Sequence, residues 1–158
     1  MAKLKKQHMT IHWKAIVQDD SSIPATEATL KEKATLVGRI GLMMLSVGTG
    51  AWRVRNSMNK VSRCLGITCT ADIGLLAISY TCIEGTDTYT QSISLPTTGV
   101  NTHKLMELEL FMKEFPDKVS TCSVKHIHEV LDEIQKFPAN YKAWNLGLAS
   151  ALACGAFT

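Results

Sequence analysis

The sequence predicts an α+β fold: a helical hairpin, an antiparallel β-hairpin, two further helices and then the start of a hydrophobic, transmembrane-like helix. Three observations predict this order. Residues 36–65 contain two segments with helical periodicity separated by glycines, and residues 67–95 are rich in β-branched and alternating residues. Helical periodicity returns over residues 105–134, and residues 143–157 carry no charge.

Length and composition fit one packed domain with appendages. The chain has 158 residues, of which 46% are hydrophobic and 20% are charged. We expect an N-terminal extension over residues 1–24, a cytosolic α+β domain over 25–138, and an apolar helix over 139–158 that begins a membrane domain. In the extension, residues 11–17 are expected to form a short helix that docks through Trp13. The net charge of +3 is too small to predict a nucleic-acid partner.

The helical hairpin is predicted to begin with a helix over residues 36–47, whose only charge is Arg39, so this helix should be buried on all sides. Gly48 and Gly50 allow a sharp turn after it, and Gly66 suits the left-handed residue that closes the second helix. In the second helix, apolar residues recur at i, i+4, i+7 and i+11, so they lie on one face that should be buried: Val54, Met58, Val61 and Leu65. Its other positions are mostly basic or amide side chains: Arg53, Arg55, Asn56, Asn59, Lys60 and Arg63.

The β-hairpin follows this helix directly. Residues 67–82 should form a strand with a break near residues 72–74. After a turn at residues 84–87, residues 88–95 alternate as a returning strand does, and Pro96 should end it. A hairpin alone is marginally stable in water, so it should lie on helices.

Two more helices are predicted after the sheet. Asn101 or Thr102 can cap the first, and Phe115-Pro116-Asp117 should stop it. Ser123 should cap the second, and Pro138 should close it. The buried positions expected in the two helices are Leu105, Leu108, Met112 and Phe115, then Val124, Ile127, Leu131 and Ile134.

The last segment is different in kind. Gly147, Ala151 and Gly155 recur at intervals of four, which is the close-packing spacing of transmembrane helices. In one interpretation this segment is a buried C-terminal helix of a soluble domain, and its length favours that reading because a spanning helix needs about 20 residues. In the other it begins a membrane helix, and the small-residue stripe favours that. We expect the helix to self-associate or to cover another apolar surface.

The motifs that usually mark chemistry are missing. His126 and His128 are two residues apart and would point to different faces of a helix, so they are expected to be surface residues rather than metal ligands. The five cysteines are scattered without a C-x-x-C pair, which predicts neither a disulfide framework nor a zinc ribbon. Cys64 lies next to Arg63 but fits a boundary position better than a reactive one. No catalytic residue, cofactor or metal is therefore expected.

The second helix also carries a family resemblance. The matching residues are Gly48, Trp52, Arg53, Val54, Met58, Leu65 and Gly66. This pattern resembles the N-terminal part of the threonine/serine exporter family of bacterial membrane proteins. The resemblance extends from about residue 36 to the C-terminus and includes Gly99-Val100-Asn101 and the apolar tail. The family often has an acidic residue after Arg-Val, where this chain has Arg55, so no role of that acid carries over.

The resemblance implies a role in transport. The chain would be the N-terminal cytosolic portion of an amino-acid exporter at the inner membrane, on its cytoplasmic side, with transport in membrane helices absent from this chain. It would not be an enzyme, and its partner would be its own membrane domain or a partner membrane subunit. Combining the motif with the polar face of the helix gives a candidate contact surface, for which a solvated face is the simpler alternative: Gly48, Trp52, Arg53, Asn56, Met58 and Arg63. The alternative function is a self-contained soluble domain that binds a small molecule or regulates.

Overall fold

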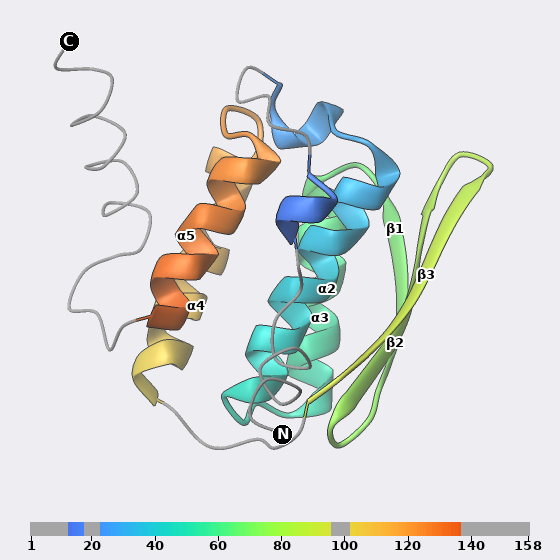
Figure 1. Ribbon diagram of the computed structural model, residues 1–158. Helices are drawn as coiled ribbons and strands as arrows, with labels where there is room; N and C mark the ends of the chain where they lie inside the picture. Colours follow the sequence, from blue (N-terminus) through green and yellow to red (C-terminus); the bar gives the residue numbers. More distant parts are fainter. Residues whose placement is uncertain (1–12, 18–22, 96–101, 137–158) are drawn as a thin grey trace, which may run out of the picture.

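The computed structural model describes residues 13–17, 23–95 and 102–136, and these form three layers. Figure 1 shows a sheet on one side, α2 and α3 in the middle, and α4 and α5 on the other side. The elements are two 3₁₀ turns, η1 (Trp13–Ala15) and η2 (Ala25–Glu27), the helices α2 (Leu30–Ser46), α3 (Ala51–Cys64), α4 (Thr102–Lys118) and α5 (Val124–Lys136), and the strands β1 (Thr68–Ile73), β2 (Ala77–Glu84) and β3 (Asp87–Ser94). The predicted α+β class is confirmed.

The central element is α2, which touches the sheet, α3 and α5. Thr29 caps it by accepting a hydrogen bond from the Glu32 backbone N–H at 3.3 Å. Two glycines let its neighbours come close. A Cβ on Gly38 would lie 2.1 Å from the Tyr80 hydroxyl oxygen, and one on Gly41 would lie 2.6 Å from the Met58 sulfur. Burial of α2 is therefore nearly complete, as its sequence predicts.

The predicted pairing of α2 with α3 is also confirmed. Gly48 turns the chain between them with a φ of 88°, and Gly66 follows the end of α3 with a φ of 77°. The four residues predicted to face inward are all buried: Val54, Met58, Val61 and Leu65. This stripe fixes α3 against α2 and β1 and leaves its other face outward.

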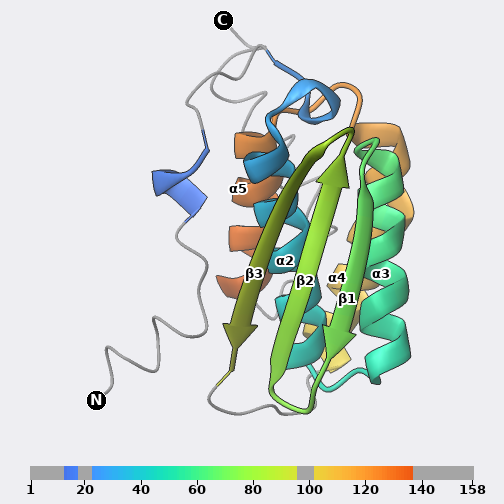
Figure 2. The same ribbon diagram turned by 90° about the vertical axis from the view of Figure 1, so that its right-hand side faces the viewer.

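The predicted β-hairpin is wrong in one respect, because the sheet has three strands in the order β1-β2-β3 (Figure 2). The break expected within residues 67–82 is a complete chain reversal, closed by a hydrogen bond from the Gly74 N–H to the Ala77 carbonyl at 2.7 Å. Leu75, at the tip of this turn, is 86% exposed. Two leucines in the turn made the sequence look like one continuous apolar strand, which hid the reversal.

One face of the sheet lies on the helices and the other is lined with hydroxyls. Ile78, Tyr80 and Cys82 of β2 are buried toward α2 and α3. On the opposite face, the hydroxyls of Ser79 and Ser92 lie 3.0 Å apart, and a second cross-strand pair joins Thr81 to Thr90 at 2.8 Å. This alternation sets which strand residues reach the core.

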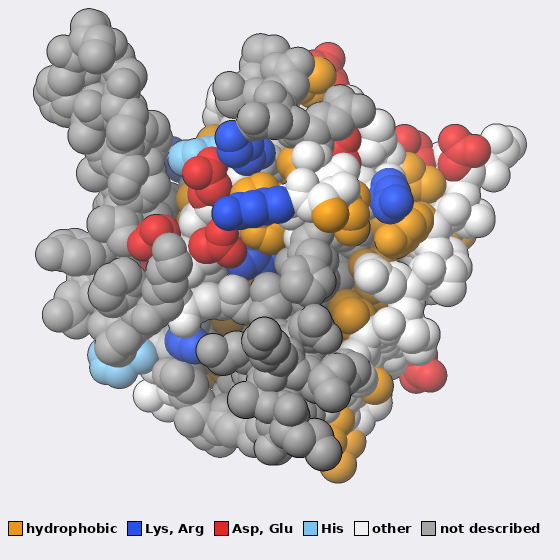
Figure 3. Space-filling view, in the orientation of Figure 1, with side chains coloured by type: hydrophobic (Ala, Val, Ile, Leu, Met, Phe, Trp, Pro, Cys, Tyr) orange, Lys and Arg blue, Asp and Glu red, His pale blue; other side chains and the backbone are white. Residues whose placement is uncertain are grey.

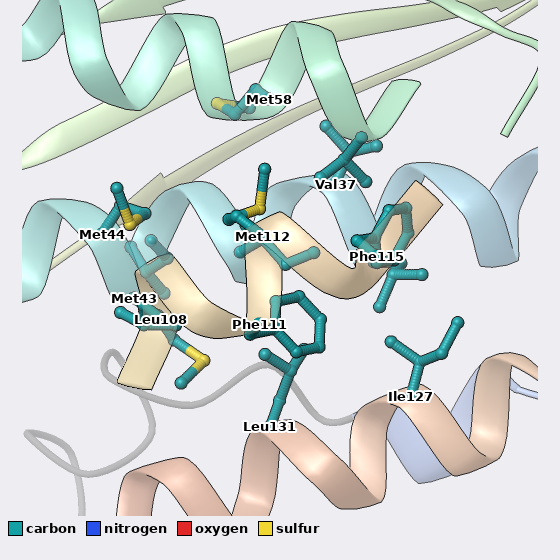
Figure 4. Packing of buried hydrophobic residues seen from close by; sticks show 14 of the residues in the cluster. Val37, Met43, Met44, Met58, Leu108, Phe111, Met112, Phe115, Ile127 and Leu131 are labelled. Carbon is teal, nitrogen blue, oxygen red and sulfur yellow. The ribbon is translucent and has the colours of Figure 1, made fainter. Parts of the chain in front are cut away.

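The helix α4 lies beside α5 in the outer layer and packs against α3. Figure 4 shows its apolar side chains between these elements, with Phe111 pointing toward Leu131 of α5. The prediction that Pro116 stops the helix is wrong. The helix continues to Lys118, and the Val119 N–H donates to the Phe115 carbonyl at 3.0 Å. Pro116 lies in the last turn, where it disrupts little of the helix, and the buried side chains of Phe115 and Val119 hold that turn in place.

The helix α5 begins as predicted, since the Ser123 hydroxyl accepts the His126 backbone N–H at 3.1 Å. Its inward residues are confirmed as buried: Val124, Ile127, Leu131 and Ile134. The prediction that both histidines lie at the surface is wrong for His128, which is fully buried. Position 128 is four residues after Val124 and three before Leu131, so it falls on the inward stripe. Trp13 covers it, with ring planes 2° apart and centroids 4.8 Å apart.

Several predictions lie outside the described residues. They include Pro138 as the end of the last helix and the stripe of small residues Gly147, Ala151 and Gly155. The domain boundaries after residues 24 and 138 stay predictions. Within the described part of the chain, no helix combines the length and the apolar character needed to cross a membrane.

Candidate functional site

The candidate contact surface is carried by α3, and its six predicted residues do not all face the same way. Trp52 is 67% exposed, and Asn56 and Arg63 are also exposed. Arg53 is half-buried, and Met58 is completely buried against α2. Met58 therefore supports the helix from behind and is not part of the accessible surface.

A hollow of about 290 Å³ opens between α3 and α4. We call it the α3–α4 hollow. Met44 and Met112 contribute its apolar part, and Trp52 stands at its α3 side. The charged and polar residues that line it are Arg53, Asn56, Ser57, Lys60, Glu109 and Lys113. The hollow thus combines an exposed indole with three basic groups and one acidic group.

The neighbouring helix changes the environment of the basic residues. Arg53 forms an ion pair with Glu109 of α4. Lys60 is half-buried and lines the same hollow. The sequence predicted that Arg53, Lys60 and Arg63 are all exposed, and this is confirmed only for Arg63. The sequence of α3 alone could not show that α4 lies alongside it.

A second hollow, of about 430 Å³, lies between α3 and β1. We call it the α3–β1 hollow. It is lined by Asn56, Asn59, Ser62, Arg63, Ile67, Thr68 and Cys69. Asn56 lines both hollows, so they form one continuous polar surface along the outer side of α3.

Among the residues that line the two hollows, Cys69 carries a thiol, and few other groups there are suited to chemistry. Burial raises the pKa of the Cys64 thiol, and the nearby Lys60 and Arg63 offset this only in part, so Cys64 is not an activated nucleophile. Among residues 13–17, 23–95 and 102–136, no three His, Cys, Asp or Glu side chains gather in a way that could hold a metal ion. The arrangement is suited to contact with a partner, through Trp, Arg and amide side chains.

A buried polar cluster lies between α2 and α5, and the sequence did not predict it. Arg39 is 2% exposed and reaches α5, where it donates to the His128 carbonyl at 3.0 Å and to Gln135 Oε1 at 2.9 Å. It also pairs with Asp132 and lies 3.1 Å from His128 Nδ1. The signal in the sequence was the single arginine within an apolar helix, because such a charge requires buried partners.

The cluster keeps His128 neutral. Burial lowers the pKa of His128 to about 2, and the positive charge of Arg39 adds to the effect. Outside the cluster, acidic and basic side chains lie next to each other over α5, as Figure 3 shows, and no single sign of charge dominates that face.

A family model described as a putative threonine/serine exporter matches residues 35–158. The chain belongs to the threonine/serine exporter family. This is a family of transporters and not of enzymes, and the described residues of this member form an α+β region. No curated protein and no solved structure matches the chain significantly.

Proposed function

We propose that this chain forms the cytoplasmic domain of a threonine/serine exporter at the inner membrane, and that membrane helices outside the α+β domain carry out the transport. The observation that supports this most strongly is the family match, which covers both the α+β domain and the apolar segment after it. In this proposal the domain assists assembly or gating and catalyses no reaction. Lysine and arginine accumulate on the cytoplasmic side of membrane proteins, which fits the basic residues of α3.

The outer side of α3 is proposed as the surface where the domain meets its own membrane part or a partner membrane subunit. Trp52 is exposed although it is large and apolar, and aromatic and arginine side chains are the usual anchors of interfaces. The buried stripe behind it holds the helix in place, so the surface is already formed before a partner binds.

Transport in cells tests the proposed function. Cells that express the full-length protein are loaded with threonine or serine, and efflux is compared with cells that carry an empty vector. The proposal predicts faster efflux of at least one of the two amino acids. Equal efflux with the protein present in the membrane fraction would contradict it.

The apolar segment after the domain is proposed to pack against another helix through Gly147, Ala151 and Gly155. Replacing Gly147 and Gly155 by leucine should block close approach and reduce self-association measured by cross-linking in membranes. Leu148→Ala is the matched control because it leaves the small-residue stripe intact. Unchanged self-association of the Gly147→Leu/Gly155→Leu variant would contradict this packing.

A further inference from the structure

The strands β1 and β2 place two cysteines directly opposite each other. Cys69 of β1 is paired with Cys82 of β2 in the register, so both side chains lie on the same face of the sheet. That face is the one that packs on the helices, where Cys82 is fully buried and Cys69 is half-buried. Neither is in a disulfide in this structure.

The hydrogen-bond pattern shows that this is a close pair. Gly74 donates its N–H to the carbonyl of Ala77, so these two residues form a hydrogen-bonded pair. Hydrogen-bonded and non-hydrogen-bonded pairs alternate along antiparallel strands. Cys69 is five positions from Gly74, which makes Cys69 and Cys82 a non-hydrogen-bonded pair, with Cα atoms about 4.5 Å apart. This lies within the roughly 4.4–6.8 Å that a disulfide spans.

The two thiols differ in access and in environment. Cys69 lines the α3–β1 hollow together with Arg63. Cys82 hydrogen-bonds to the Cys69 sulfur, and this lowers the pKa of Cys69; burial opposes the shift in part, and the Ser62 hydroxyl adds a smaller lowering. The same hydrogen bond, together with burial, raises the pKa of Cys82. A reagent that enters the hollow therefore meets Cys69 first, in the more reactive state.

We propose that Cys69 and Cys82 form a reversible redox pair that reacts with a low-molecular-weight disulfide in the α3–β1 hollow, with Cys69 as the attacking thiol and Cys82 as the resolving thiol. Arg63, at the same hollow, favours a disulfide that carries carboxylates. The hollow is part of the outer side of α3, but the redox chemistry does not require the proposed transport role, and oxidation would join β1 to β2 next to that surface.

The reaction has two steps. The Cys69 thiolate attacks one sulfur of the small disulfide, forms a mixed disulfide and releases one small thiolate. Cys82 then loses its proton and attacks the Cys69 sulfur, which releases the second small thiolate. Two protein thiols are oxidised to one disulfide, the small disulfide is reduced to two thiols, and the two protons from the protein end on those thiols.

Other cysteines serve as internal references. Burial raises the pKa of Cys64 and of Cys122, which makes both thiols less reactive. Neither faces another cysteine in the sheet register, because both lie outside the strands. Cys154 lies outside the described residues.

The test treats the whole chain with oxidised glutathione, followed by thiol counting under denaturant and mass spectrometry of non-reduced peptides. The proposal predicts loss of two of the five thiols, a peptide pair joined through Cys69 and Cys82, and reaction at Cys69 about tenfold faster than at Cys64 or Cys122. A disulfide between other cysteines, or equal reactivity of all thiols, would overturn it. This measurement uses the unaltered protein, so it does not depend on whether a variant folds.

Two variants then separate the roles. Cys82→Ser should stop the reaction at a stable glutathione adduct on Cys69, whereas Cys69→Ser should give neither an adduct on Cys82 nor a disulfide. Cys64→Ser is the matched control and should still form the Cys69–Cys82 bond. If the Cys69→Ser variant formed a glutathione adduct on Cys82, Cys82 could act as the attacking thiol, and this would contradict the proposal.

Discussion

Within the apolar part of α2, residues 36–46, Arg39 carries the one charged side chain. It is held by Asp132, Gln135 and His128, all on α5, so it ties the central layer to the outer one. Such buried pairs contribute little net stability when complete, but removing one partner leaves a charge without compensation. The stability of the domain should therefore depend strongly on these partners.

Asp132→Ala should lower the free energy of unfolding by about 3 kcal/mol, because it leaves the Arg39 guanidinium buried without its carboxylate. The value is at the lower end of the range for buried pairs, since the Asp132 side chain is 30% exposed. Urea unfolding measures it. Glu133→Ala is the control because Glu133 is not among the groups that Arg39 binds, and equal effects of the two variants would contradict the role given to Asp132.

His128 predicts a pH dependence of stability. Its pKa is depressed to about 2 in the folded protein, whereas in the unfolded chain it is about 6.5. Below pH 6.5 only the unfolded state takes up a proton there, so stability should fall by up to about 1.4 kcal/mol per pH unit. Between pH 6.5 and 5 the His128→Phe variant should lack this part of the slope, while His126→Gln should largely retain it. An unchanged slope in His128→Phe would be evidence against a neutral buried histidine.

At the scale of elements, α2 owes its central place to two glycines as much as to its apolar residues. Gly38 admits the rigid ring of Tyr80, whose hydroxyl donates to the Ala34 carbonyl at 2.7 Å. Gly41 admits the flexible side chain of Met58. Alanine is the better helix former by about 1 kcal/mol, but close packing opposes it at both positions.

Gly38→Ala should destabilise the domain by about 1–3 kcal/mol, because the added methyl group overlaps the Tyr80 ring and the helix or the sheet must move. Gly41→Ala should cost less, since the end of the Met58 side chain can shift. Thermal and urea unfolding of both variants checks the order. If Gly41→Ala destabilises the domain more than Gly38→Ala does, the contact of Gly38 with the rigid Tyr80 ring is not the tighter constraint on α2.

The elements also show what the sequence could predict. The helices were recognisable from the spacing of their apolar residues. Val54, Met58 and Val61, for example, lie on one face only if the segment is helical. The chain reversal at Leu75 was hidden because the residues of the turn are apolar. The exposure of Leu75 follows from its place at the tip of the sheet, which the local sequence does not show. Pro116 predicts a helix end because its signal is local, whereas α4 continues to Lys118 through burial in the tertiary structure, which the local sequence does not show. The position of His128 follows from helical spacing, but its polarity obscured it.

For the whole molecule, the candidate surface was only partly predictable. The polar side of α3 was evident from its periodicity, and the exposure of Trp52, Asn56 and Arg63 agrees with it. The two hollows could not be predicted, because they are made where α4 and β1 meet α3. The chain belongs to the threonine/serine exporter family, and under the proposed function the exposed Trp52 becomes a point of contact with the membrane part.

The outer side of α3 is proposed to serve contact with a partner and not folding. The most direct measurement compares export by the full-length protein with the stability of the domain for Trp52→Ala/Arg63→Ala. Both side chains are exposed, so unfolding free energy should change by less than about 0.5 kcal/mol per substitution. Arg55→Ala, exposed on the same helix but outside both hollows, is the matched control and should leave export intact. We predict that Trp52→Ala/Arg63→Ala loses most of its export while the domain stays folded; unchanged export would contradict the contact surface and leave α3 with an ordinary solvated face.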